Sequence, residues 1–341
     1  MTERRIAVVT GASAGVGRAT VRRLAEQGFD VALLARGAAG LEGAASEVKL
    51  SGGRSFVVPV DVSDYEAVDA AASRIEAEFG PIDVWINNAM TTVFAPLSET
   101  NPADFKRAVE VTLLGQVWGT MAALTRMRER DRGNIVNVGS ALSFVGIPLQ
   151  AAYCASKFAC RGFFESVRAE LLHEGSNVKM SMVHLPAVNT PQFSWCKTTL
   201  RRHPKPVPPI YQPEIAADHI VQAALDGRRS RILGSWNKML VLVDSLAPGV
   251  GNQYAALAAW DAQLTDETID PGRPSNLMGP VDNDSDQGCH GVFDDQSGGM
   301  LDPSFLRSLP QTASLFGKAV RYEMQGRGSN SRSSDRVRSR G

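Results

Sequence analysis

The sequence has no excess charge of either sign, because lysine plus arginine and aspartate plus glutamate each number 36 among 341 residues. No long-range field would draw such a chain to nucleic acid or to an anionic membrane surface. Long apolar runs are also missing. Residues 239–243 end at Asp244, far short of the roughly 20 residues that cross a bilayer. These absences predict a protein without a membrane span and without nucleic-acid partners.

An export signal and a cysteine framework are missing as well. The apolar stretch at residues 6–9 lacks the length of a signal-peptide core, and no cleavage-like segment follows it. The chain has four cysteines and no Cys-x-x-Cys pair, and none of them groups with histidine in the way metal sites do. We therefore expect a cytoplasmic protein with reduced thiols and no metal. The cysteines are Cys154, Cys160, Cys196 and Cys289.

What the sequence does contain is a regular alternation of apolar runs and helical patterns over its first 185 residues. The runs are nearly continuous in Val, Ile and Leu, which is typical of strands buried on both faces of a parallel sheet. We predict an α/β fold, namely a Rossmann-type doubly wound parallel sheet in three α/β/α layers, as a single domain over residues 1–260. The runs cover residues 6–9, 31–34, 56–60, 84–86, 135–138 and 180–185.

The composition changes after this domain. Residues 266–302 are acidic and rich in Gly, Pro, Asn and Ser, whereas residues 321–341 are dominated by Arg and Ser. Such segments bury little apolar surface, so we predict a disordered tail over residues 261–341, interrupted by a weak helix at 304–317. The arginines at 327–332 would suit RNA or an acidic partner, but we favour a solvated tail. Within the domain, the proline-rich residues 186–211 predict a lid or specificity loop.

A glycine loop follows the first predicted strand and precedes a helical pattern, with the spacing Gly-x-x-x-Gly-x-Gly. Gly11 would permit the tight turn, Gly15 would let the backbone approach a pyrophosphate, and Gly17 would let the helix pack on the sheet. A phosphate there would lie at the positive end of the helix. The competing interpretation is a glycine turn without a ligand. We favour a dinucleotide site that includes Ser13 and Val16.

The end of the second predicted strand bears on which dinucleotide is used. An acidic residue there would bind the adenosine ribose hydroxyls, whereas an arginine would accept a 2′-phosphate. The chain has Arg36 and no carboxylate at this position. We predict NADP(H) rather than NAD(H), the alternative being that Arg36 is only an exposed charge at a strand end.

Tyr153 and Lys157 are four residues apart in a helical pattern, with Ser140 thirteen residues before the tyrosine. The spacing puts the phenol and the ammonium on one helix face, where Lys157 would lower the pKa of Tyr153 from its ordinary value of about 10. Such a tyrosine could act as an acid near neutral pH. Taken alone, the pair fits a solvated amphipathic face equally well.

Together these motifs resemble the short-chain dehydrogenase/reductase family over roughly residues 5 to 250. The family's loop matches residues 10–17, and its catalytic trio matches Ser140, Tyr153 and Lys157. The resemblance implies hydride transfer between a nicotinamide and a carbonyl or secondary alcohol carbon. The other positions that it implies in cofactor binding are Asp61, Val62, Asn88, Ala89, Val188 and Thr190.

In the roles that the resemblance implies, Tyr153 gives or takes the proton on the substrate oxygen and Ser140 hydrogen-bonds that oxygen. Lys157 would bind the nicotinamide ribose and lower the pKa of Tyr153. The sequence departs from the family pattern at three places. Thr112 stands where many members carry an asparagine of a proton relay, Met90 replaces a glycine, and Ala187 replaces another.

Several apolar residues follow the predicted strand ends and would face the substrate. They predict a hydrophobic ketone, aldehyde or alcohol, although the same residues would serve equally well as core. The set is Phe94, Leu142, Phe144, Val145, Leu149, Phe193 and Trp195.

Two rival functions remain open at this point. One is a catalytically inactive dinucleotide-binding module that acts through partners, and the other is an epimerase or dehydratase of the extended relatives, which the glycine spacing disfavours. The long helices near residues 102–130 and 151–174 match those through which family members pair. We therefore expect a homodimer or homotetramer.

Overall fold

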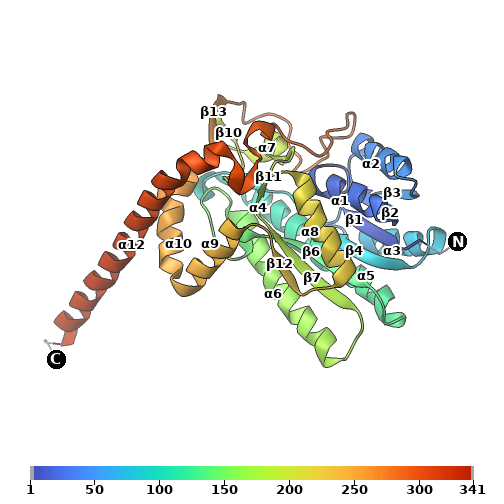
Figure 1. Cartoon of the computed structure of the whole chain (residues 1–341), viewed down its shortest axis with the longest axis horizontal. Coiled ribbons are helices and arrows are strands. Elements are labelled where there is room, and N and C mark those ends of the chain that lie inside the picture. Colours follow the sequence, from blue (N-terminus) through green and yellow to red (C-terminus); the bar gives the residue numbers. More distant parts are fainter. Residues whose placement is uncertain (1–3, 339–341) are drawn as a thin grey trace.

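A seven-stranded parallel sheet forms the centre of the computed structural model, which describes residues 4–338 (Figure 1). The strand order is β12-β7-β6-β4-β1-β2-β3, so the chain builds outward from β1 in both directions. This is the doubly wound arrangement predicted from the sequence. The strands are β1 (Ile6–Thr10), β2 (Asp30–Ala35), β3 (Ser55–Pro59), β4 (Ile82–Asn87), β6 (Asn134–Ser140), β7 (Lys179–Leu185) and β12 (Ser230–Ile232).

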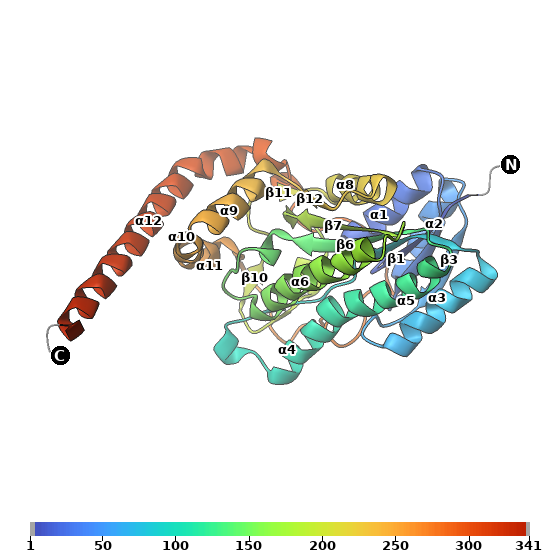
Figure 2. The same cartoon turned by 90° about the horizontal axis from the view of Figure 1, so that it is seen from below.

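Helices cover both faces of this sheet and complete the three layers (Figure 2). One face packs on α1 (Gly15–Glu26), α2 (Ala38–Leu50) and α8 (Pro213–Asp226), and the other on α3 (Tyr65–Glu78), α5 (Gly115–Glu129) and α6 (Ala151–His173). Alternate residues of β1 contribute to the two cores, since Ala7 and Val9 join one and Ile6 and Val8 the other. Burial of both faces explains why the strands are apolar without alternation.

A buried polar network ties α5 to the centre of the sheet. The Trp85 indole donates to Asn87 Oδ1 at 2.8 Å, and Asn87 Nδ2 donates to Thr120 Oγ1 at 3.0 Å and to Asn137 Oδ1 at 2.8 Å. Gly119 lets the helix approach, because a Cβ at this position would overlap Asn87 Oδ1. The helix is thereby held close to the end of β4.

Short elements connect the layers and surround the carboxyl ends of the strands. α4 (Pro102–Val109) continues through a π-helical turn (Glu110–Leu114) into α5, and 3-10 turns lie at Leu97–Glu99 and Ala141–Ser143. The predicted loop at 186–211 contains α7 (Gln192–Trp195) and four two- or three-residue strands, which are β8 (Ala187–Val188), β9 (Lys197–Thr198), β10 (Arg202–Pro204) and β11 (Ile210–Tyr211). A further short strand, β5 (Val93–Phe94), lies outside this loop and pairs with β9.

The segment after residue 260 differs from the sequence-based expectation of disorder. β13 (Leu264–Thr268) pairs antiparallel with β10, and the chain then runs back across the domain to residue 302. Its few apolar residues reach core positions, as Leu277 does, and its carbonyl groups accept hydrogen bonds from arginines of the domain, including Arg36 and Arg107. Composition alone predicted disorder because it does not show these distant donors.

The remaining helices form one end of the molecule (Figure 1). α9 (Ser235–Leu246) and α10 (Pro248–Tyr254) pack together, a π-helical turn (Ala255–Ala259) and α11 (Trp260–Ala262) follow, and α12 (Pro303–Arg338) packs on α10. The helix expected at 304–317 lies within α12. Short 3-10 turns lie at Asp294–Gln296 and Gly299–Leu301. In the described part of the chain, no helix combines the length and apolar character needed to cross a membrane.

Gly119→Ala should lower the free energy of unfolding by about 2 kcal/mol, since the new methyl group would push against the buried Asn87 network. Urea unfolding of the full chain measures this. Gly146→Ala is the matched control: an added Cβ meets nothing within 4 Å there, so the change should stay within about 0.5 kcal/mol. Equal effects of both substitutions would contradict the prediction.

Candidate active site

All the site residues predicted from the sequence lie around one groove at the carboxyl ends of the strands. The groove begins at the glycine loop, passes the ends of β2, β4 and β6, and reaches α7 and α9. The members of the predicted set along its wall are Gly11, Ser13, Gly15, Val16, Gly17, Arg36, Asp61, Val62, Asn88, Ala89, Ser140, Tyr153, Lys157, Val188 and Thr190.

The glycine loop has the backbone that its sequence requires. Gly11 and Gly15 have φ angles of +66° and +56°, a region that disfavours residues with a Cβ. A Cβ on Gly17 would overlap the carbonyl oxygen of Gly11, so the first turn of α1 can pack on the loop only with glycine. This backbone geometry and the start of α1 fit the approach of a pyrophosphate, although the Gly15 amide itself donates to the Gly288 carbonyl at 3.0 Å.

The end of β4 forms the floor beneath this loop. Asn88 Nδ2 donates to the Thr10 carbonyl at 3.0 Å, and the Thr10 hydroxyl accepts from the backbone amides of Asn88 and Ala89 at 3.0 and 3.1 Å. These bonds fix the ends of β1 and β4 to each other. The groove therefore has a rigid floor where the dinucleotide would cross it.

Charged side chains gather at the end of the groove next to β2. Arg36 lies 3.6 Å from Asp61, and Arg107 pairs with the same carboxylate. Burial would raise the pKa of Asp61, but hydrogen bonds from Ser63 and Arg107 outweigh it and lower that pKa. Arg36 is not simply exposed at a strand end, because its guanidinium donates to carbonyl groups of residues 276–278.

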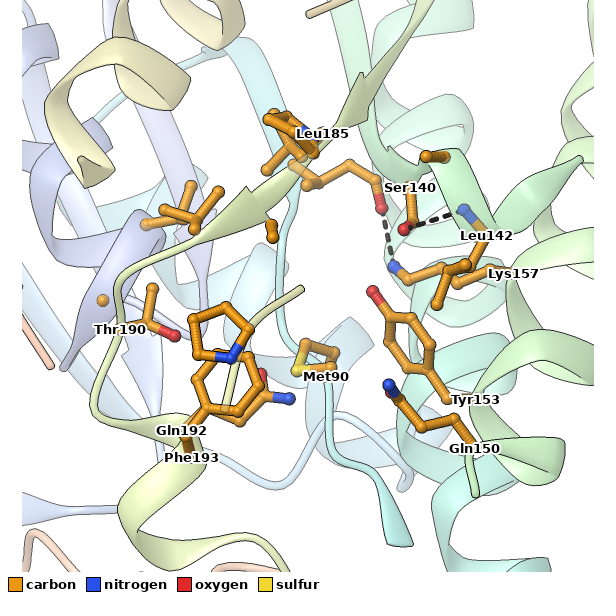
Figure 3. A pocket seen from close by; sticks show the side chains of 18 of the residues that line it. Met90, Ser140, Leu142, Gln150, Tyr153, Lys157, Leu185, Thr190, Gln192 and Phe193 are labelled. Carbon is orange, nitrogen blue, oxygen red and sulfur yellow. Dashed lines mark hydrogen bonds between the residues drawn. The ribbon is translucent and has the colours of Figure 1, made fainter. Parts of the chain in front are cut away.

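The predicted catalytic trio meets in the middle of the groove (Figure 3). Ser140 is the last residue of β6, and its hydroxyl accepts from the Leu142 amide at 3.1 Å. Lys157 is 1% exposed and donates to the Val138 carbonyl at 2.7 Å. Its nitrogen lies 5.6 Å from the centre of the Tyr153 ring, and the phenol oxygen of Tyr153 points toward Ser140 and Lys157.

The expected lowering of the pKa of Tyr153 is not found in this structure. Burial raises the pKa of the phenol well above its ordinary value, and a hydrogen bond with Ser140 offsets only part of that rise. Burial also lowers the pKa of Lys157, whose ammonium is bound by the Val138 carbonyl. Desolvation is therefore the main cause of both shifts, and the phenol is protonated at neutral pH.

Thr112 lies behind the trio, in the π-helical turn before α5. Its hydroxyl donates to the Thr91 carbonyl at 2.7 Å and accepts from the Thr91 amide at 3.0 Å. Both bonds hold the segment after β4 and leave the side chain fully buried. Thr112 thus supports the backbone of the segment after β4, and its hydroxyl proton is already used.

The predicted apolar wall is only partly present. Leu142, Val145, Phe193 and Trp195 line the groove together with Met90. Phe94 and Leu149 instead form a separate core cluster with Cys196 and Leu264, and Phe144 packs against the His184 ring at a centroid distance of 4.7 Å. For Phe94, Phe144 and Leu149, a position near a strand end did not determine the direction of the side chain.

Several residues of the groove were missed by the sequence analysis. Trp236, Leu240 and Tyr254 come from the helices that follow β12, and Asn276 and Asp282 come from the segment expected to be disordered. None belongs to a recognisable motif, since they reach the groove only through packing of distant segments. Arg107, which holds Asp61, follows no local pattern either.

This groove and its sheet define a dinucleotide-binding α/β oxidoreductase. The family model described as "short chain dehydrogenase" matches residues 5–198. The uncharacterised oxidoreductase YxnA of Bacillus subtilis is 30% identical over 318 residues, covering 93% of this chain and 85% of YxnA. The chain belongs to the short-chain dehydrogenase/reductase family, whose members use NAD(P).

Two solved structures are similar to this chain. An alcohol dehydrogenase of the archaeon Thermococcus sibiricus, complexed with 5-hydroxy-NADP, aligns with a TM-score of 0.59 and 29% identity over 68% of this chain and 95% of its own. A metagenomic short-chain oxidoreductase in complex with NADP aligns with a TM-score of 0.57 and 28% identity over 67% and 96%. Nearly all of each relative is matched, whereas a large part of this chain extends beyond the shared fold.

His184 supports the trio from β7. Its Nδ1 lies 3.3 Å from the Ser140 carbonyl oxygen, and burial lowers its pKa from 6.5 to about 4, despite the favourable contact with that carbonyl. The ring is therefore neutral at neutral pH and would have to be charged inside the core at low pH.

The free energy of unfolding should fall as the pH drops from 6.5 toward 4. In this range the unfolded chain takes up a proton on His184 before the folded chain does. This difference lowers the free energy of unfolding by roughly 3 kcal/mol at most. Urea unfolding at several pH values measures the slope, and His184→Gln should reduce it. His173→Gln, at the exposed end of α6, is the control; an equal reduction there would refute the assignment.

Proposed function

We propose that this protein transfers a hydride between NADP(H) and the carbonyl or secondary alcohol carbon of a small hydrophobic molecule. The observation that carries the proposal is the convergence of Ser140, Tyr153 and Lys157 in the groove that begins at the glycine loop. A phenol, a hydroxyl and an ammonium at one place suit the protonation and orientation of a substrate oxygen.

Each member of the trio has a role that its surroundings support. Tyr153, with its raised pKa, holds a proton at neutral pH and would give it to the substrate oxygen during reduction. Ser140 would hydrogen-bond the same oxygen and orient it. Lys157, anchored on Val138, would supply a fixed positive charge next to the phenol and hold the nicotinamide ribose.

The cofactor would supply or accept the hydride, and the groove offers donors along its length. Gly11 and Gly15 would let the backbone approach the pyrophosphate, Gly17 lets α1 pack on the loop, and Val188 and Thr190 would hold the carboxamide end. Arg36 favours the 2′-phosphate of NADP(H). The two similar structures that contain NADP or its derivative support this preference.

The apolar wall supports a hydrophobic substrate. Phe193 and Trp195 of α7 face the groove together with Trp236 and Leu240 of α9, and Phe316 of α12 closes the same end. Moving an apolar carbon skeleton from water onto such a wall is favourable. The wall offers a charged group no comparable replacement for its hydration. We therefore propose an uncharged ketone, aldehyde or alcohol with a substantial apolar portion.

We also propose that copies of the chain pair through α5 and α6. Met121 on α5 and Phe158 on α6 are large apolar side chains that stand 42% and 43% exposed on this chain alone. Burying them against a second copy would remove apolar surface from water. The helices are those that the sequence motifs suggested for pairing.

The alternative function is a dinucleotide-binding module without turnover. Thr112 favours it, since it stands in place of the relay asparagine and its hydroxyl proton is already donated to the Thr91 carbonyl. The intact trio favours catalysis. We retain the enzyme as the better-supported function because all three reactive groups share the groove.

Tyr153→Phe tests the central role. It should reduce turnover at least about a thousandfold, because the phenol proton is lost, while leaving NADPH affinity within roughly threefold. The measurement is NADPH oxidation against a panel of apolar ketones and aldehydes, with NADPH binding followed by its fluorescence. Retained turnover would remove Tyr153 from its role, and turnover only with anionic sugars would refute the apolar substrate.

The cofactor preference is tested on the unmodified protein by comparing kcat/KM for NADPH and NADH with one substrate. We expect NADPH to be favoured by roughly tenfold or more, since Arg36 adds a charge contact that NADH lacks. A clear preference for NADH would overturn the assignment of Arg36.

A further inference from the structure

Residues 276–288, which we call the C-terminal strap, lie across the adenosine end of the groove. The segment follows β13, which ends at Thr268, and runs toward α2 (Figure 1). It contributes Asn276, Pro280, Val281 and Asp282 to the groove wall, beside the glycine loop and the end of β2. A segment more than 230 residues away in sequence from Arg36 thus forms part of the cofactor site.

Arginines of the domain hold the first part of the strap. Arg36 donates to the carbonyl groups of Asn276, Leu277 and Met278, and Arg107 Nε donates to the Leu277 carbonyl at 3.1 Å. Leu277 itself is buried against Val93 and Ala95 in a small apolar cluster. The strap is therefore fixed both by charge-assisted hydrogen bonds and by apolar packing.

The second part of the strap is bound to α1 and α2. The amides of Ala39 and Gly40 donate to the carbonyl groups of Asn283 and Asp282, each at 3.2 Å. Further along, Asp286 pairs with the buried Arg18 at 3.0 Å. The Gly15 amide also donates to the Gly288 carbonyl at 3.0 Å. Both ends of the strap are thus anchored, with Asp282 between them.

The carboxylate of Asp282 lies in the turn between β2 and α2. Only 6% of the residue is exposed, and a Cβ on Gly37 would overlap its Oδ1. Its other oxygen lies close to Gly40, in the first turn of α2, where a helix favours negative charge. The carboxylate also contributes to the electrostatic environment of Arg36. The Asp282 carboxylate therefore lies at the end of β2, where the groove would distinguish NADP(H) from NAD(H).

We propose that Asp282 is a cofactor-selectivity residue, which the strap brings to the end of β2 and which disfavours the 2′-phosphate of NADP(H). This inference rests on the proposed function. The end of β2 carries Arg36 but no carboxylate, and the strap supplies the missing carboxylate from elsewhere in the chain. A phosphate drawn to Arg36 meets the like charge of Asp282, whereas ribose hydroxyls can donate to it.

The observed cofactor preference is then the difference between two opposed contributions. Arg36 attracts the phosphate and Asp282 repels it, so removal of the Asp282 charge shifts the balance toward NADP(H) whichever cofactor the native protein prefers. A purely structural role would act differently. If Asp282 only held the strap on α2, its loss would weaken the binding of both cofactors by the same factor.

Asp282→Asn tests the proposal because it removes the charge and keeps the shape and the backbone bonds. Dissociation constants for NADPH and NADH, measured by nucleotide fluorescence on the full chain, should show NADPH binding tightened by about tenfold. NADH binding should stay the same or weaken. Asp282→Ser should shift the ratio in the same direction, which guards against a defect particular to one variant.

Asp284→Asn is the matched control, since Asp284 lies on the same strap, is exposed and is absent from the groove wall. It should leave the ratio of the two dissociation constants unchanged. An unchanged ratio in the Asp282 variants, or equal weakening of both cofactors, would overturn the proposal while leaving the proposed function intact. Native protein that binds neither nucleotide would overturn both.

Discussion

Burial of both faces of the parallel sheet is the constraint on which the rest of the structure depends. With α1, α2 and α8 on one face and α3, α5 and α6 on the other, only the strand ends remain for polar chemistry. The glycine loop, the Asn88 floor and Ser140 follow three different strands yet meet along one groove, because parallel strands all end at the same edge. The chemistry of this protein is thus confined to one edge by packing.

The same burial determines the properties of the reactive groups. Tyr153 and Lys157 lie deep enough that desolvation is the main influence on both pKa values, and the phenol stays protonated. The Val138 carbonyl compensates the buried ammonium, and His184 stays neutral beside Ser140. A charge at this depth is tolerated only where a polar partner is built into the strand end. The site is therefore preorganised by the backbone of β6 and β7.

The charges of the whole chain balance, yet individual charged side chains make specific contacts that position one segment of the chain. Arg18, Arg36 and Arg107 are each bound to groups of residues 276–288, and these contacts hold a segment with few apolar residues against the wall of the groove. The similar solved structures align with about two thirds of this chain. About a third of this chain therefore extends beyond the part that those structures match.

The sequence by itself determined the sheet and the glycine loop, because each depends on periodicity or on close spacing along the chain, and the family resemblance implied the meeting of Ser140, Tyr153 and Lys157. Only the tertiary structure decided that Phe144 turns away from the groove, that burial raises the pKa of Tyr153, and that residues 276–288 are ordered. These features depend on side-chain direction, depth and partners more than a hundred residues away. Such contacts leave no local pattern, since packing and desolvation are properties of the assembled chain.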